Sequence, residues 1–96
     1  MKKLHLLFSN EIQMGKDTMR LEYSLTEKSL SSEGQPTSIY GIQVAKHFNQ
    51  KVELDEVIGI SESKETVISI LKKLFQYEVT PISMVEIVDE LVTQSV

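Results

Sequence analysis

The last third of the chain most constrains the fold, because it is typical of two amphipathic helices joined by a short, proline-marked corner. At about 100° per residue, two apolar stripes appear on the helical wheel, the second covering roughly 160°. The stripes consist of Val67, Ile68, Ile70, Leu71, Leu74, Phe75 and Tyr77, and of Met84, Val85, Ile87, Val88, Leu91 and Val92. Ser61 is the expected N-cap of the first helix, and Thr80-Pro81 is the expected start of the second. Residues 61–96 are therefore predicted to form a helical pair.

The segments upstream alternate apolar and polar residues, as half-buried strands do. Residues 19–26 follow this period strictly, and residues 39–45 resume it, with Gly41 marking a bulge or a close backbone approach. Residues 47–50 are the expected turn into a strand over residues 52–60. The phase of that strand breaks at Asp55, which indicates either a bulge or an early strand end. Residues 27–38 are rich in serine and contain Gly34 and Pro36, so they predict a polar connection that is mobile over residues 31–35.

Two interpretations fit residues 1–18. Their apolar residues fall mostly at even positions, so they form either a further strand, folded back through Gly15-Lys16-Asp17, or an irregular arm. With either interpretation, residues 1–96 are one small α+β domain. The predicted architecture is an antiparallel sheet of three to four strands with two C-terminal helices packed on one face.

Composition and charge exclude several classes of protein. The chain has no cysteine, which rules out disulfides and thiolate metal sites and favours a reducing cytoplasm. Its net charge is −4, and Arg20 is its single arginine, so a phosphate lattice would be bound poorly. No stretch approaches the roughly 18 apolar residues that cross a bilayer. We therefore expect neither a nucleic acid nor a membrane as partner.

No catalytic, cofactor-binding or metal-binding residues are predicted. His5 and His47 stand alone, outside any spacing typical of zinc ligands, and surface or strand-end positions suit them. The serines lie outside any Gly-x-Ser-x-Gly motif, and the four glycines do not form a phosphate-binding loop.

Two small groups of residues remain as candidates for a binding role. Glu86, Asp89 and Glu90 lie on the polar side of the second predicted helix, where they form either a hydrated surface or a contact for a basic partner. Tyr40 and Tyr77 accompany apolar stripes. Core packing is the simpler role for these tyrosines, and a pocket between sheet and helices is the alternative.

Several short motifs resemble an uncharacterised family, a domain of unknown function found in small Gram-positive bacterial proteins of clostridial type. The resemblance covers residues 21–92 and rests on Tyr40-Gly41-Ile42, Ile60-Ser61, Val79-Thr80-Pro81-Ile82 and Glu86-Ile87-Val88-Asp89-Glu90-Leu91. It implies a small bacterial cytoplasmic protein and brings no functional residues with it.

Three functional hypotheses follow from the sequence. The first is a non-enzymatic protein-interaction or regulatory module, whose exposed sheet edges could pair with a second copy to give a homodimer. The second is a small-molecule-binding protein or weak enzyme with a pocket near Tyr40 and Tyr77. The third is an acidic inhibitor that presents Glu86, Asp89 and Glu90 to a basic partner.

Overall fold

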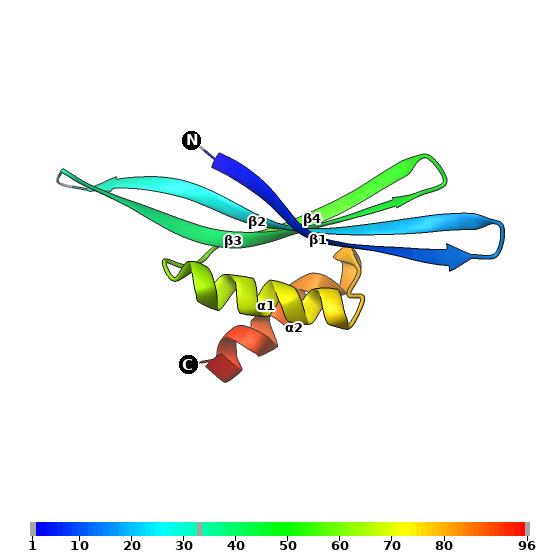
Figure 1. The fold of residues 1–96 in the computed structure, drawn as a ribbon. Helices are drawn as coiled ribbons and strands as arrows, with labels where there is room; N and C mark the ends of the chain where they lie inside the picture. Colours follow the sequence, from blue (N-terminus) through cyan, green and yellow to red (C-terminus); the bar gives the residue numbers. More distant parts are fainter. Residues whose placement is uncertain (1, 33, 96) are drawn as a thin grey trace.

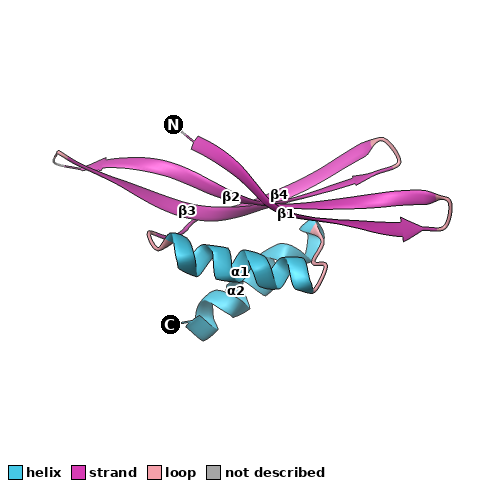
Figure 2. Cartoon of the chain, in the orientation of Figure 1, coloured by secondary structure: helices cyan, strands magenta, loops and turns pink. Residues whose placement is uncertain are grey.

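The protein is a four-stranded antiparallel sheet followed by two helices, as predicted. A computed structural model describes residues 2–32 and 34–95. In the sheet, each strand pairs with its neighbour in sequence, in the order β1-β2-β3-β4. Both helices lie on one side of the sheet, and its other side carries no helix (Figures 1 and 2). The elements are β1 (Lys2–Met14), β2 (Asp17–Ser32), β3 (Gln35–Phe48), β4 (Lys51–Ser61), α1 (Lys64–Gln76) and α2 (Pro81–Ser95).

Two-residue turns close the first and third hairpins. Gly15-Lys16 joins β1 to β2, with Gly15 at a φ of 66°. Asn49 and Gln50 join β3 to β4 with φ values of 53° and 62°, as a type I′ turn requires, and such a turn matches the twist of the strands. Of the two interpretations of residues 1–18, the strand is confirmed. The turn between β3 and β4 is shorter than the predicted residues 47–50, because His47 and Phe48 still belong to β3.

The polar connection predicted over residues 27–38 is wrong, because most of it is strand. β2 continues to Ser32, β3 starts at Gln35, and these two residues face each other in the ladder. A ladder is held by backbone N–H and C=O groups, which a serine-rich sequence supplies as well as an apolar one. The expected mobile segment at 31–35 falls partly on residue 33, outside the described residues.

A bulge in β1 moves its apolar residues from one face of the sheet to the other. Leu6 pairs with Ser24, but Phe8 pairs with Tyr23, so one extra residue lies between them. Because side chains alternate along a strand, this slip places Leu4 and Leu6 on the face without helices and Phe8 on the helical face. The even-numbered apolar residues of β1 therefore do not share one face.

Gly41 lies where two backbones come close, one of the two roles the sequence predicted. A Cβ atom there would lie 2.3 Å from the carbonyl oxygen of Val57 and 2.8 Å from the Cα of Ile58. The register of β3 and β4 shifts at this point, between Tyr40 and Ile42. Neither the bulge predicted near Asp55 nor an early strand end occurs, since pairing is regular there and β4 runs on to Ser61.

Helix α1 starts two residues later than its sequence predicts. β4 includes Ser61, and the N-cap is Ser63, whose side chain accepts a hydrogen bond from the backbone N–H of Thr66 at 3.3 Å. At its other end, Glu78 has a φ of 53° and Val79 N donates to the carbonyl of Leu74 at 3.0 Å. This is the Schellman pattern, and it turns the chain towards α2.

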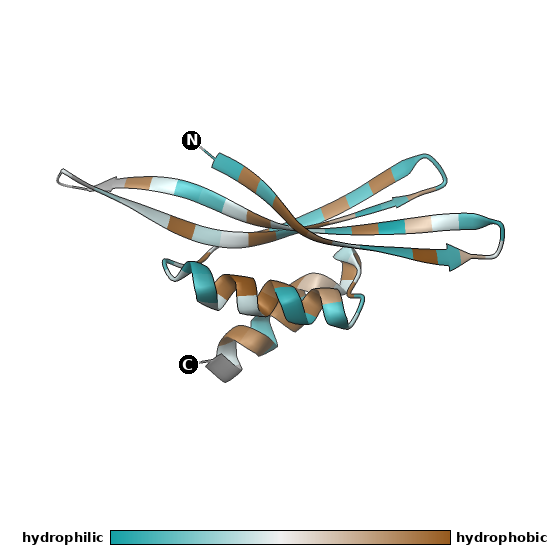
Figure 3. Ribbon diagram, in the orientation of Figure 1, coloured by the Kyte–Doolittle hydropathy of each residue, from teal (hydrophilic) through white to brown (hydrophobic). Residues whose placement is uncertain are grey.

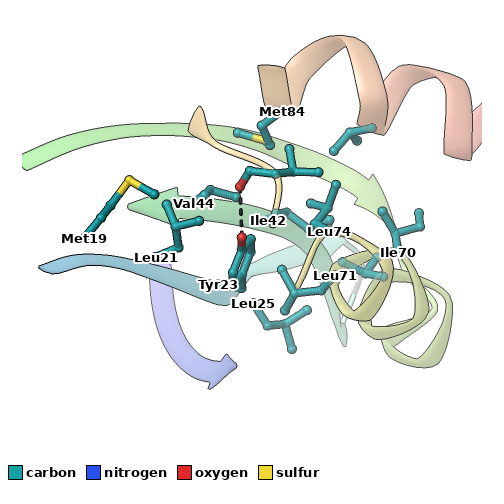
Figure 4. Close-up of a cluster of buried hydrophobic side chains, with 13 residues drawn as sticks. Met19, Leu21, Tyr23, Leu25, Ile42, Val44, Ile70, Leu71, Leu74 and Met84 are labelled. Carbon is teal, nitrogen blue, oxygen red and sulfur yellow. Dashed lines mark hydrogen bonds between the residues drawn. The ribbon is translucent and has the colours of Figure 1, made fainter. Parts of the chain in front are cut away.

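The core lies between the helices and the sheet (Figure 4). Its members are apolar residues of β2, β3, both helices and the connection between the helices: Met19, Leu21, Tyr23, Leu25, Ile42, Val44, Val67, Ile70, Leu71, Leu74, Val79, Met84 and Val88. The Tyr23 hydroxyl donates to the carbonyl oxygen of Val79 at 3.0 Å, which anchors the corner between the helices to the sheet. Burial raises the pKa of Tyr23 to about 12, against a weaker lowering by Asn10 and a small further rise from Glu78.

Helix α2 begins at Pro81 as predicted and packs mainly against β4. Met84 and Val88 are buried, whereas Val85, which the sequence assigned to the apolar stripe, is exposed. The buried stripe of α2 is therefore narrower than predicted, and Ile82, which lay outside the predicted stripe, is exposed as well. The helix therefore covers the β4 side of the sheet with only part of its apolar surface.

Candidate functional site

The feature that calls for a functional explanation is the face of the sheet turned away from the helices, here called the open face. The core residues of β2 have odd numbers, so its even-numbered residues point to the open face. Residues paired directly across an antiparallel ladder share a face, and this rule extends the open face from β2 to the other strands.

Large aliphatic side chains stand on the open face along both edge strands. Leu4 and Leu6 of β1 are 53% and 56% exposed, and Val52, Leu54 and Ile58 of β4 are 56–57% exposed. The strands in Figure 3 show this mixture of apolar and polar positions. Single exposed apolar residues are ordinary, but here two groups of them stand on one side of the sheet, one on each edge strand, and apolar clusters of this kind occur at interaction sites. We call these five residues the aliphatic patch.

The centre of the open face is made of small and polar side chains. Ser24 and Thr26 on β2 are 5% and 3% exposed, and Gly41 on β3 is buried beside them. Gln43 and Ala45 continue the row along β3. Around Ser24, Thr26 and Gly41 the open face is therefore lower than at the aliphatic residues of its edge strands, whereas Arg20, Glu22 and Lys28 project from other positions of β2.

Among residues 2–32 and 34–95, three carboxylates lie on the open face, and each contacts a cationic or basic side chain of the same chain. Glu11 Oε1 lies 3.4 Å from Arg20 Nη2, and Glu22 Oε1 lies 2.6 Å from His47 Nε2. At the other end, Glu56 of β4 pairs with the amino group of Lys2, which reaches across from β1. Such hydrogen-bonding and ionic partners lower the cost of covering a surface, because none of these carboxylates is left alone when water is removed.

A hollow of about 340 Å³ lies at one end of the open face. Ile39 and Ile58 provide apolar walls, Lys2 and Lys28 stand at the rim, and Thr26 and Gly59 also line it. A second hollow, of about 220 Å³, lies near the β3–β4 turn, lined by Lys46, Phe48, Asn49, Lys51 and Glu53. The first has the size of a small ligand site but few convergent polar groups.

His5, Glu27 and Ser38 form a polar cluster on the other face. His5 Nε2 lies 3.1 Å from one carboxylate oxygen of Glu27, and the Ser38 hydroxyl donates to the other at 3.1 Å. These two hydrogen bonds, with His5 the stronger influence, hold the pKa of Glu27 below its usual value. The carboxylate lies between the serine and the histidine, whereas an activated serine needs the histidine beside it. The cluster thus lacks the order of a nucleophilic triad.

Tyr40 and Tyr77 are not brought together. Tyr40 pairs with Ser61, just before α1, and Tyr77 caps the far end of the same helix. A helix of 13 residues separates them by about 20 Å. Tyr77 is 74% exposed, so its predicted place in the apolar stripe is wrong, and the two tyrosines do not share a pocket.

The acidic trio of the second helix lies on the surface. Glu86, Asp89 and Glu90 are all exposed on α2, away from the buried Met84 and Val88. Within residues 2–32 and 34–95, no cluster of three or more histidine and carboxylate side chains could hold a metal ion. Among the same residues, neither helix is both long and apolar enough to cross a bilayer.

The sequence interpretation missed the open face, although β4 carries a signal for it. Val52, Leu54 and Ile58 fall on one face of this strand and Val57 on the other, so the strand is apolar on both sides. A strand with one solvated face shows a clean alternation instead. The phase break at Asp55, interpreted as a bulge or an early strand end, instead marks the change of the apolar positions from one face of β4 to the other.

These features define a class: a small α+β protein whose helices cover one face of a sheet and whose other face carries an apolar patch with matched charges. The chain belongs to a family of unknown function, DUF6514, which matches residues 2–94. No curated protein and no solved structure is significantly similar to it.

Proposed function

We propose that the protein is a non-enzymatic protein-interaction module that binds its partner through the open face. The observation that carries the proposal is the aliphatic patch: five large side chains, each more than half exposed, on one side of a sheet. Apolar patches of this kind mark protein-interaction surfaces. Fully burying one such side chain is worth about 1.5–3 kcal/mol, so a partner that covers the exposed halves gains several kcal/mol.

The charges of the open face also suit a protein partner. With its three carboxylates matched internally, the face offers neither a cationic stripe for phosphates nor a bare acidic surface. We place the protein in the cytoplasm of a Gram-positive bacterium of clostridial type, where a chain without cysteine needs no oxidising environment.

Site-specific photo-crosslinking in the source cells tests the proposal. A photoreactive residue at Leu54, in the aliphatic patch, is compared with one at Lys72, an exposed position of α1. We expect a discrete protein adduct from position 54 and none from position 72. Equal labelling from both positions, or none from position 54, refutes the proposal.

A small-molecule-binding protein is the second candidate, favoured by the hollow beside Lys2 and Lys28. Its apolar walls, the amino group of Lys28 and that of Lys2, which also pairs with Glu56, suit a small organic anion. A thermal-shift screen against common organic acids tests this, since a ligand at 100 times its Kd stabilises the fold by about 2.7 kcal/mol. A stabilisation that survives Lys28→Ala, or no stabilisation by any acid, removes this candidate.

A further inference from the structure

We propose that the occupant of the open face is a second copy of this chain, so that the protein is a homodimer of two sheets packed face to face. This inference rests on the proposed function and names its partner. Three observations lead to a second copy: the distribution of charge, the shape of the face and its area.

The net charge of the chain lies on residues outside the open face. Within the described part of the chain, the face carries three cationic and three acidic residues, whose charges cancel: Lys2, Arg20, Lys28, Glu11, Glu22 and Glu56. The other seven cations and eleven carboxylates carry the whole net charge of −4. Two identical acidic molecules repel each other through most of their surfaces, and the neutral open face is where that repulsion is weakest.

The open face also has the shape that a copy of itself can fill. Its edges carry aliphatic side chains two residues apart, such as Leu4 and Leu6 on β1 and Val52 and Leu54 on β4. Between them the face is low around Thr26, because Ser24 and Gly41 beside it are small. A partner that fits must present protruding aliphatic side chains at the spacing of a strand, and the edge strands of a second copy present them.

The area of the face agrees with this interpretation. Four strands spaced about 4.8 Å apart, followed for about nine residues at 3.3 Å each, cover roughly 600 Å² of sheet plane. Side chains make the accessible surface larger than this flat area, and a standard interface buries about 800 Å² of accessible surface per partner. In a symmetric dimer the same patch is used twice, so both copies lose exposed aliphatic surface at one contact.

Sedimentation analysis over a wide range of protein concentration tests the dimer. We expect a reversible monomer–dimer equilibrium for the natural chain. Leu54→Ser should weaken dimerisation roughly tenfold or more, since each dimer loses two aliphatic contacts. Leu6→Ser, on the opposite edge strand, provides a second variant. The control is Ile82→Ser, because Ile82 is 82% exposed on α2, away from the open face. Circular dichroism and thermal melting show that each variant is folded.

Each outcome supports or overturns the dimer. Dimerisation lost with the two patch variants and kept with the control supports it. A chain that stays monomeric at every concentration overturns it. A dimer unaffected by Leu54→Ser and Leu6→Ser also overturns it and indicates pairing of strand edges instead. Photo-crosslinking at position 54 separates the two proposals: an adduct with a different protein refutes self-association and keeps the interaction module, whereas a missing adduct refutes both.

Discussion

Replacing Gly41 by alanine tests how β3 and β4 are held together. The new methyl group would lie 2.3 Å from the Val57 carbonyl oxygen, 2.7 Å from the Thr26 hydroxyl and 2.8 Å from the Ile58 Cα. Two of these three atoms belong to the backbone of β4, so a change of side-chain rotamer cannot make room. β4 has to move away from β3.

The expected loss of stability can be worked out from this geometry. Overpacking a tight site costs about 1–3 kcal/mol. Moving β4 also weakens backbone hydrogen bonds near the contact, each worth about 0.5–1.5 kcal/mol. We therefore expect Gly41→Ala to lower the free energy of unfolding by about 2–4 kcal/mol, which corresponds to a fall in Tm of about 10–25 °C for a domain of this size.

Urea denaturation and thermal melting, followed by circular dichroism, measure this change. The matched control is Gln43→Ala, two residues along the same strand and on the same face, which we expect to cost less than about 1 kcal/mol. Hydrogen exchange should show that the added lability begins in β4. If Gly41→Ala melts within a few degrees of the control, β3 and β4 are not as close as described and the reasoning is wrong.

Three further predictions concern the core and the polar cluster. Leu71→Asp should unfold the domain because Leu71 is fully buried, whereas Lys72→Asp should leave the melting temperature almost unchanged; equal melting temperatures would refute the orientation of α1. Tyr23→Phe should cost about 1–3 kcal/mol in urea denaturation by leaving the Val79 carbonyl without its donor, and a neutral result would show that water replaces the hydroxyl. The lowered pKa of Glu27 contributes stability that is fully present above about pH 4.3, the pKa of an unperturbed glutamate, and is lost as the pH falls through the lower folded value. Glu27→Gln should therefore reduce stability at neutral pH, and its difference from the natural chain should shrink in that acid range; a constant difference would contradict the assignment.

The helices and the central strands could be predicted from sequence because their signals are periodic and one-sided. Val67, Leu71 and Leu74 recur at helical spacing, and residues 19–26 alternate strictly, since each element has one buried face. The close approach at Gly41 was also predictable, because an isolated glycine inside a strand pattern usually marks a bulge or a neighbouring backbone.

The remaining features depend on interactions that a local pattern does not record. The β2–β3 ladder around Ser29 and Ser38 is held by backbone groups, so its polar sequence was typical of a loop. The bulge after Leu6 reverses the faces of β1, and this can be seen only in the pairing with β2. The true N-cap, Ser63, competes with Ser61 two residues earlier, and the length of β4 decides between them.

The candidate site was missed for a related reason. The alternation around Leu54 predicted a strand, but hydrophobic periodicity does not say which of the two faces of a strand the helices will cover. The tyrosines were grouped by their apolar neighbours, and the length of α1 keeps them apart.

The connection of strands only to their immediate neighbours has a consequence for how the chain is made. Hairpins closed by two-residue turns form quickly from local contacts. The pairing of β1 to β4 therefore does not depend on segments that are distant in the sequence. The apolar face of the sheet that forms the core, however, is covered by α1 and α2, which are synthesised last. At ribosomal rates of about 5–20 residues per second, the nascent sheet stays uncovered for roughly two to six seconds while residues 64–95 are added. In a truncated chain ending before Lys64, this apolar face would stay exposed to solvent, and we expect the chain to aggregate.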